Sequence, residues 1–119
     1  MTTTEAVTST ALDEVAEERK RQDAKWGEQN HPNGTGPQKV FFAAVMGRNK
    51  TFGNIEKYAK QTTDDHAAAG AVTFADILLE EVFEALAEED PAALRAELIQ
   101  CAAVATQWVE AIDRAEASK

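Results

Sequence analysis

The chain has 119 residues, 44% of them apolar, which is enough for one domain with a hydrophobic core. Its net charge of −9 argues against non-specific binding of DNA or RNA, which needs a basic face. A single cysteine excludes an internal disulfide, and no apolar run approaches the roughly 20 residues of a membrane span. The N-terminus also lacks the regions of a signal peptide. We therefore expect a cytoplasmic protein that binds neither nucleic acid nor membranes.

Residues 1 to 10 are rich in threonine and serine, and we expect them to form a flexible N-terminus. A first helix is predicted over residues 11 to 27, because its apolar residues share one face at helical spacing. Arg19 and Asp23 are polar members of that inward stripe. Residues 27 to 37 contain two prolines and three glycines, which predicts a loop long enough to have a function.

Two helices are predicted next, over residues 38 to 48 and 54 to 69, with Gly70 as the residue that follows the second.

The strongest helix starts follow. Thr73 and Asp76 have the spacing of a capping box, and Asp90 stands as an N-cap before a proline. These features predict a helix over residues 74 to 88, a sharp turn, and an antiparallel helix over residues 91 to 115.

No segment shows the period-2 alternation of a strand, and the chain contains no internal repeat. We therefore predict an all-α fold, an antiparallel bundle of about four to five helices that forms one domain over residues 11 to 116. Two strongly amphipathic helices in a chain this short also predict a homodimer or higher homo-oligomer.

Three glutamates stand where apolar residues are expected. On a helical wheel, Glu81 falls inside the apolar arc of residues 74 to 88, Glu84 lies at its edge, and Glu97 lies within the arc of residues 91 to 115. Carboxylates are rarely buried unless their charge is compensated. Residues three apart share a helix face, and an antiparallel partner can bring the third glutamate opposite them. The pattern predicts a Mg²⁺ site, or a Mn²⁺ site; the alternative is a set of solvated glutamates.

The run Glu80-Glu81-Val82-Phe83-Glu84, followed by Glu97, resembles the EExxE and ExxD motifs of the MazG-like, all-α nucleotide pyrophosphohydrolases. The segment from Arg19 to His31 also resembles the opening of small phage and actinobacterial MazG-like proteins. The resemblance implies hydrolysis of a nucleoside triphosphate to a monophosphate and pyrophosphate, with Mg²⁺ held by Glu81, Glu84 and Glu97. It also implies an oligomer.

This chain departs from the family at one ligand, because the final aspartate is replaced by Gln100. Its neutral amide offers one carbonyl oxygen without charge, so metal affinity should fall. Activity is then reduced, shifted to another substrate or lost, and Asp23 is a substitute ligand to consider. Besides the hydrolase, two alternatives stay open: a non-catalytic nucleotide- or metal-binding module, and a helical interaction protein.

Catalysis also needs a group that takes a proton from water. We assign this role to one of the three glutamates or to Glu80, acting through a water molecule. The helical wheel places Glu80 away from the apolar arc, toward Asp76 and Ala87.

The first helix and the following loop supply the residues that we expect at the substrate: Arg19, Asp23, Lys25, Trp26, Asn30 and His31. Arg19 suits a bidentate phosphate contact, but an ion pair with Asp23 or with a glutamate of the cluster is an equal alternative. Lys25 is a phosphate ligand or a solvated charge, and Trp26 is a core anchor or a stacking platform for a base. The asparagine and the histidine can hydrogen-bond a base or sugar, or lie exposed.

Four basic residues gather in the middle of this acidic chain: Arg48, Lys50, Lys57 and Lys60. They can steer a polyphosphate toward the site or form an ordinary solvated face.

Overall fold

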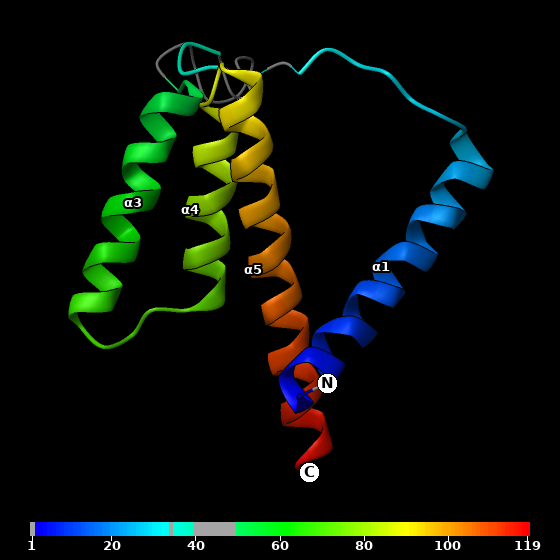
Figure 1. Ribbon diagram of the computed structural model, residues 1–119. Coiled ribbons are helices and arrows are strands. Elements are labelled where there is room, and N and C mark those ends of the chain that lie inside the picture. Colours follow the sequence, from blue (N-terminus) through cyan, green and yellow to red (C-terminus); the bar gives the residue numbers. More distant parts are fainter. Residues whose placement is uncertain (1, 34, 40–49) are drawn as a thin grey trace. The chain divides into compact units, whose positions relative to one another are not determined.

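The structure is a computed structural model that describes residues 2–33, 35–39 and 50–119 (Figure 1). These residues form four helices and no strand: α1 (Thr3–Trp26), α3 (Phe52–Ala68), α4 (Phe74–Leu86) and α5 (Pro91–Ala117). The predicted all-α class is therefore confirmed. Residues 40 to 48 of the helix predicted over 38 to 48 lie outside the described residues. None of the described helices has the length and apolar character needed to cross a membrane.

The chain divides into two compact units. The first contains residues 1–32 and 105–119, and the second contains residues 33–104. Helix α5 contributes its first half to the second unit and its last half to the first. The single domain expected over residues 11 to 116 stays a prediction.

In the first unit, α1 begins at Thr3 rather than at the predicted residue 11. The reason is a capping box that the sequence analysis overlooked. The hydroxyl of Thr2 accepts from the Glu5 amide at 3.1 Å, and the Glu5 carboxylate accepts from the Thr2 amide at 2.8 Å. Both bonds satisfy amides that a helix start leaves without a partner. The helix ends before Gly27, which has a φ of 70°.

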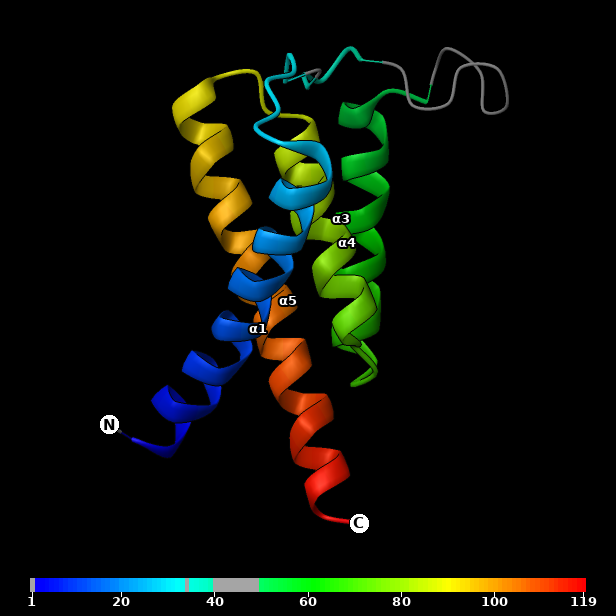
Figure 2. The same ribbon diagram turned by 90° about the vertical axis from the view of Figure 1, so that its right-hand side faces the viewer.

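In the second unit, α3 and α4 lie side by side in both views (Figures 1 and 2). The chain leaves α3 through Gly70, whose φ of 69° favours glycine. The predicted capping box at the start of α4 is confirmed, because Thr73 and Asp76 exchange both hydrogen bonds. Asp76 also binds His66 Nδ1 at 2.7 Å, which ties the start of α4 to the end of α3.

The start of α5 is also confirmed, because the Asp90 carboxylate accepts from the Ala93 amide at 2.9 Å. A turn over residues 87–90 thus joins α4 directly to α5. The best-buried apolar side chains of this unit belong to three helices: Ala59, Phe83, Ala85 and Leu94. The apolar arc predicted for this helix consists of Phe74, Ile77, Leu78, Val82 and Ala85. Phe83 lies outside that arc and is nevertheless buried, so α4 is covered over a wider face than its pattern indicated.

The end of the predicted Gly/Pro loop is attached to the end of α4. The Gly36 amide donates to the Leu86 carbonyl at 2.9 Å, and the Thr35 hydroxyl donates to the Glu88 carbonyl at 2.7 Å. These carbonyls belong to the helix end, where no intrahelical partner exists. One residue further, the Gly53 amide donates to the Pro37 carbonyl at 3.1 Å, so the same short segment also contacts the start of α3.

Candidate functional site

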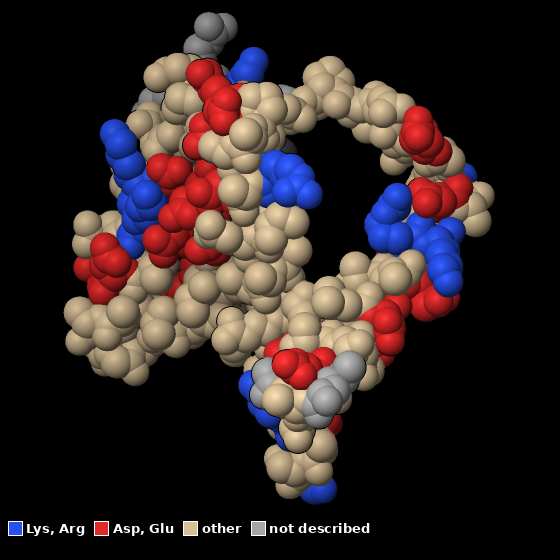
Figure 3. Space-filling model, viewed as in Figure 1, with Lys and Arg blue, Asp and Glu red and all other residues tan. Residues whose placement is uncertain are grey.

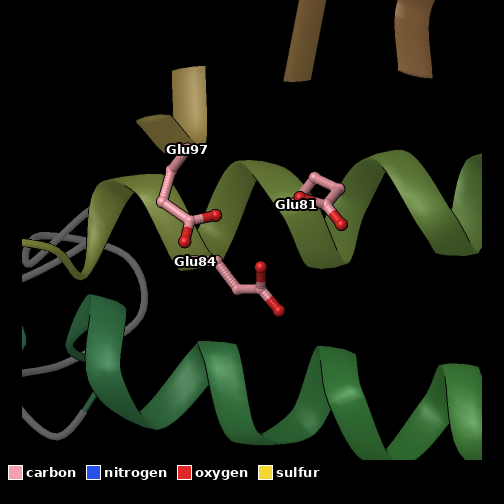
Figure 4. A group of neighbouring side chains, drawn as sticks. All are labelled: Glu81, Glu84 and Glu97. Carbon is pink, nitrogen blue, oxygen red and sulfur yellow. The ribbon is translucent and has the colours of Figure 1, made fainter. Parts of the chain in front are cut away.

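Three of the four predicted metal ligands come together in the second unit (Figure 4). Glu81 and Glu84 extend from one face of α4, and Glu97 faces them from α5. One carboxylate oxygen of each lies within 4.8 Å of the others. The geometry follows from the sequence, since residues three apart share a helix face and the turn after α4 returns the chain beside it.

Two of these carboxylates keep an oxygen that is both buried and unpartnered. Glu81 Oε2 and Glu97 Oε2 are shielded from solvent and accept no hydrogen bond from any described residue. An unpaired buried polar atom costs roughly 1–3 kcal/mol, and more when it is charged. Within residues 2–33, 35–39 and 50–119, the charge on these two oxygens is therefore left without a hydrogen-bonding partner.

The pKa values of the glutamates reflect the same uncompensated negative charge. Burial raises the pKa of Glu81, and the charges of Glu97 and Glu80 raise it further. Burial also raises the pKa of Glu84 to about 7, with the charges of Glu81 and Glu97 adding to the effect. Without a cation, part of the cluster takes up protons near neutral pH.

Lys60 is the cation nearest to Glu84 among the described residues that form ion pairs. Its ammonium lies 3.9 Å from Glu84 and 3.9 Å from Glu56, so its charge is divided between two carboxylates. It lowers the pKa of Glu84, but burial and the neighbouring glutamates have the larger effect.

Cys101 is half-buried on α5 beside the cluster. Burial raises the pKa of its thiol first, and the charges of Glu81, Glu97 and Glu84 raise it further. A thiol that holds its proton is a poor nucleophile, which favours a packing role for this residue over a chemical one.

A solvent-open cavity of about 380 Å³ lies beside the cluster and has Glu84 in its wall. Glu56 and Glu88 contribute further carboxylates, and Asn54 and Lys57 contribute polar groups from the start of α3. Glu84 belongs both to the cluster and to the cavity wall, so a molecule in this cavity can reach the Glu84 carboxylate.

The other predicted residues of this site lie at its margin. Glu80 is half-buried on α4, outside the cluster, and acts on it through its charge. Gln100 is solvent-exposed on α5, one turn beyond Glu97.

The predicted substrate residues belong to the first unit, whereas the carboxylates belong to the second. Arg19 forms an ion pair with Asp23 at 2.8 Å, and both side chains are exposed. Trp26 is 61% exposed, so the described structure does not support a core anchor. The ammonium of Lys25 lies 4.8 Å from the centre of the Trp26 ring. Asn30 donates to Glu28 at 3.2 Å and His31 is exposed.

Sequence reasoning missed one buried carboxylate, Glu110, which is 8% exposed on α5 and accepts a hydrogen bond from the Thr8 hydroxyl. Thr8 is 102 positions away from Glu110 in the sequence, so no local sequence pattern predicts this hydrogen bond. The same holds for Lys60 and Glu84, which come from different helices.

No protein-family model, curated protein or solved structure matches the chain. The resemblance to the MazG-like proteins therefore rests on the sequence motifs alone.

Proposed function

We propose that this protein is a metal-dependent nucleotide pyrophosphohydrolase. It would cleave a nucleoside or deoxynucleoside triphosphate, or a related nucleotide, to a monophosphate and pyrophosphate. One observation carries the proposal: three carboxylates from two helices converge beside a cavity, and two of them keep a buried oxygen without a partner. The EExxE motif formed by Glu80 to Glu84 supports the same reading.

The residues fit a hard divalent cation. Mg²⁺ prefers oxygen ligands and is commonly held by a few carboxylates together with water and substrate phosphates. The buried oxygens of Glu81 and Glu97 and the cavity-facing carboxylate of Glu84 provide this donor set. Mn²⁺ suits the same ligands. When bound, such an ion neutralises phosphate charge and lowers the pKa of an attacking water.

The protein residues divide the remaining tasks. Glu81, Glu84 and Glu97 hold the ligand sphere in place from two helices, and Lys60 helps to orient Glu84 across the α3–α4 contact. The proton of the attacking water goes to one of these glutamates or to Glu80. Cleavage then breaks a phosphoanhydride bond, with the water oxygen bonded to one phosphorus and pyrophosphate leaving.

Residues of the first unit remain the proposed substrate contacts, on their chemistry and on the MazG-like resemblance: Arg19, Asp23, Lys25, Trp26, Asn30 and His31. The exposed Trp26 ring and the Lys25 ammonium beside it suit a base and its phosphates.

We also propose a homodimer or higher oligomer. Three large apolar side chains of α4 and the first half of α5 are more than half exposed: Leu79, Leu98 and Ile99. Apolar surface that is left exposed is typical of interaction sites, and a second copy offers the same surface in return.

A second candidate is a nucleotide- or metal-binding module without turnover. The observation that favours it is Gln100, which brings no charge to the place where the related motif has an aspartate. Binding would then survive while hydrolysis is lost.

A nucleotide panel tests the proposal. It should include the common triphosphates, the deoxynucleotides and guanosine tetraphosphate, each with Mg²⁺ and with Mn²⁺, and pyrophosphate release should be measured. Release that Glu81→Gln abolishes supports the hydrolase. Nucleotide binding without release supports the second candidate. Absence of both binding and release contradicts the two together.

A further inference from the structure

A second cavity, of about 360 Å³, adjoins the one beside the carboxylates. Lys50, Asn54, Lys57 and Tyr58 line it, and Asn54 and Lys57 line both cavities. Figure 3 shows basic side chains gathered along the outer flank of α3, next to the acidic side chains over α4. Arg48, the fourth member of the predicted basic cluster, lies outside the described residues.

The two cavities differ in charge. Glu56, Glu84 and Glu88 line the first, whereas the described residues that line the second include two lysines and no acid. Lys57 forms no ion pair with any described residue, in contrast to Lys60 one turn later. The ammonium of Lys50 lies 5.6 Å from the centre of the Tyr58 ring, which holds the cation at the cavity without neutralising it.

The start of α3 also borders this region, but its backbone amides are already used. The Phe52 amide donates to the Lys39 carbonyl, the Gly53 amide to Pro37, and the Asn54 amide to the Thr51 hydroxyl. A free helix N-terminus would itself be an anion site, so this pairing removes that explanation. An anion here must be recognised by the lysine side chains.

We propose that the second cavity binds the terminal phosphates of the nucleotide, the part that leaves as pyrophosphate. The inference rests on the proposed function, which places the reacting phosphate at Glu81, Glu84 and Glu97. Lys57 stands in the wall that the two cavities share, so one polyphosphate chain can extend from the carboxylates to the lysines. In a chain of net charge −9, such a local cationic site is needed to hold a polyanion.

The proposal defines a substrate class. Affinity should depend on the number of phosphates more than on the base, because the second cavity recognises the phosphate end. Inorganic tripolyphosphate should therefore bind without any nucleoside, and a nucleoside triphosphate should bind more tightly than the matching monophosphate.

Calorimetric titration of the full chain with inorganic tripolyphosphate, in the presence of Mg²⁺, tests this. We expect Lys57→Met to weaken binding at least tenfold and Lys50→Met to weaken it severalfold. Lys20→Met is the matched control, because it removes the same charge from α1, where Lys20 pairs with Glu17. The affinity of Lys20→Met for tripolyphosphate should stay within twofold of that of the wild type. Lys57→Arg should also retain most of the affinity, which separates loss of charge from a disturbed fold.

Several outcomes would overturn the proposal. The first is a wild type that does not bind tripolyphosphate at millimolar concentration. The second is an equal affinity for tripolyphosphate in Lys57→Met and Lys20→Met. The third is an equal loss of affinity in Lys57→Arg and Lys57→Met. If the wild type releases pyrophosphate but the lysine variants bind tripolyphosphate normally, this phosphate site is rejected and the proposed hydrolase is not. Lysine-dependent tripolyphosphate binding by a protein that hydrolyses nothing would support the anion site and reject the hydrolase.

Discussion

The ammonium of Lys60 lies 3.9 Å from a carboxylate oxygen of Glu84, yet the pKa of that carboxyl is raised to about 7. One partly exposed lysine, shared with Glu56, is too little to offset burial and two neighbouring glutamates. Attraction between unit charges also falls quickly when water screens it. The cluster therefore needs additional positive charge or protons.

Mg²⁺ or Mn²⁺ should raise the melting temperature of the protein, because a cation compensates the buried oxygens of Glu81 and Glu97. A ligand that binds only the native state adds about 2.7 kcal/mol at a hundred times its Kd. Thermal melts with and without the ion measure the effect. The rise should vanish in Glu81→Gln and persist in Glu116→Gln, a control on the exposed end of α5. An equal rise of the melting temperature in the wild type and in Glu81→Gln would contradict the assignment of Glu81 as a metal ligand.

The metal-free protein should become less stable as the pH rises from about 5 to 7.5. The pKa of Glu84 is raised from 4.5 to about 7 in the folded state, so the folded protein keeps a proton that the unfolded chain releases. This contribution is present at pH 4.5 and is lost by pH 7. Its upper limit is roughly 3.5 kcal/mol, because one pKa unit corresponds to about 1.4 kcal/mol.

Urea denaturation at several pH values measures this slope. Glu84→Gln should flatten it, and saturating Mg²⁺ should do the same in the wild type. The raised pKa of Glu81 acts in the same direction, so a remaining small slope in the variant is expected. A wild-type stability that climbs steadily between pH 5 and 7.5 would contradict the prediction.

Gln100→Asp should tighten metal binding by restoring an anionic oxygen one turn after Glu97. The gain should be of order 1–3 kcal/mol, the range for a contact to a charged group. Calorimetric titration with Mn²⁺ decides. Gln107→Asp is the matched control, since it adds the same charge at another exposed glutamine of α5. An unchanged affinity in Gln100→Asp would mean that this exposed side chain lies outside the ligand sphere.

Sedimentation should show at least a dimer at micromolar concentration, because Leu79, Leu98 and Ile99 expose apolar surface on the paired helices. Leu98→Lys should shift the population toward monomer, whereas Gln107→Lys, which adds the same charge at a polar position, should not. A well-folded wild type that sediments as a clean monomer would reject the assembly and any site that spans it.

The elements of the second unit were predictable because their signals are local. The start of α4 is set by Thr73 and Asp76, and the start of α5 is set by Asp90 and the proline that follows it. Each of these signals spans at most four residues. The convergence of the three glutamates followed from helical spacing and an antiparallel turn. The early start of α1 was also local, but the capping box of Thr2 and Glu5 lies in a segment whose composition suggested a frayed end.

Contacts between distant segments could not be predicted in this way. Nothing in the sequence near Glu84 indicates that Lys60 will face it, and nothing near Glu110 indicates Thr8. The cavities depend on how the segment after the loop meets the start of α3, which is a matter of tertiary packing. Periodicity states which face of a helix is apolar, but it does not say which polar residue of another helix will stand opposite.

The attachment of the loop end to α4 has a consequence for how freely this chain tolerates substitution. Gly36 has a φ of 139°, and an added Cβ would meet the Glu89 side chain at 3.0 Å; at Gly53 it would lie 2.9 Å from the Pro37 carbonyl oxygen. A side chain at Gly36 would strain a backbone conformation that favours glycine, and one at Gly53 would push against the Pro37 backbone in the cavity wall. In a saturation library, both glycines should therefore be intolerant although neither has a functional group. Variants there should lose expression and folding together with binding, whereas glutamine at Glu81 should keep the fold and lose only the ion.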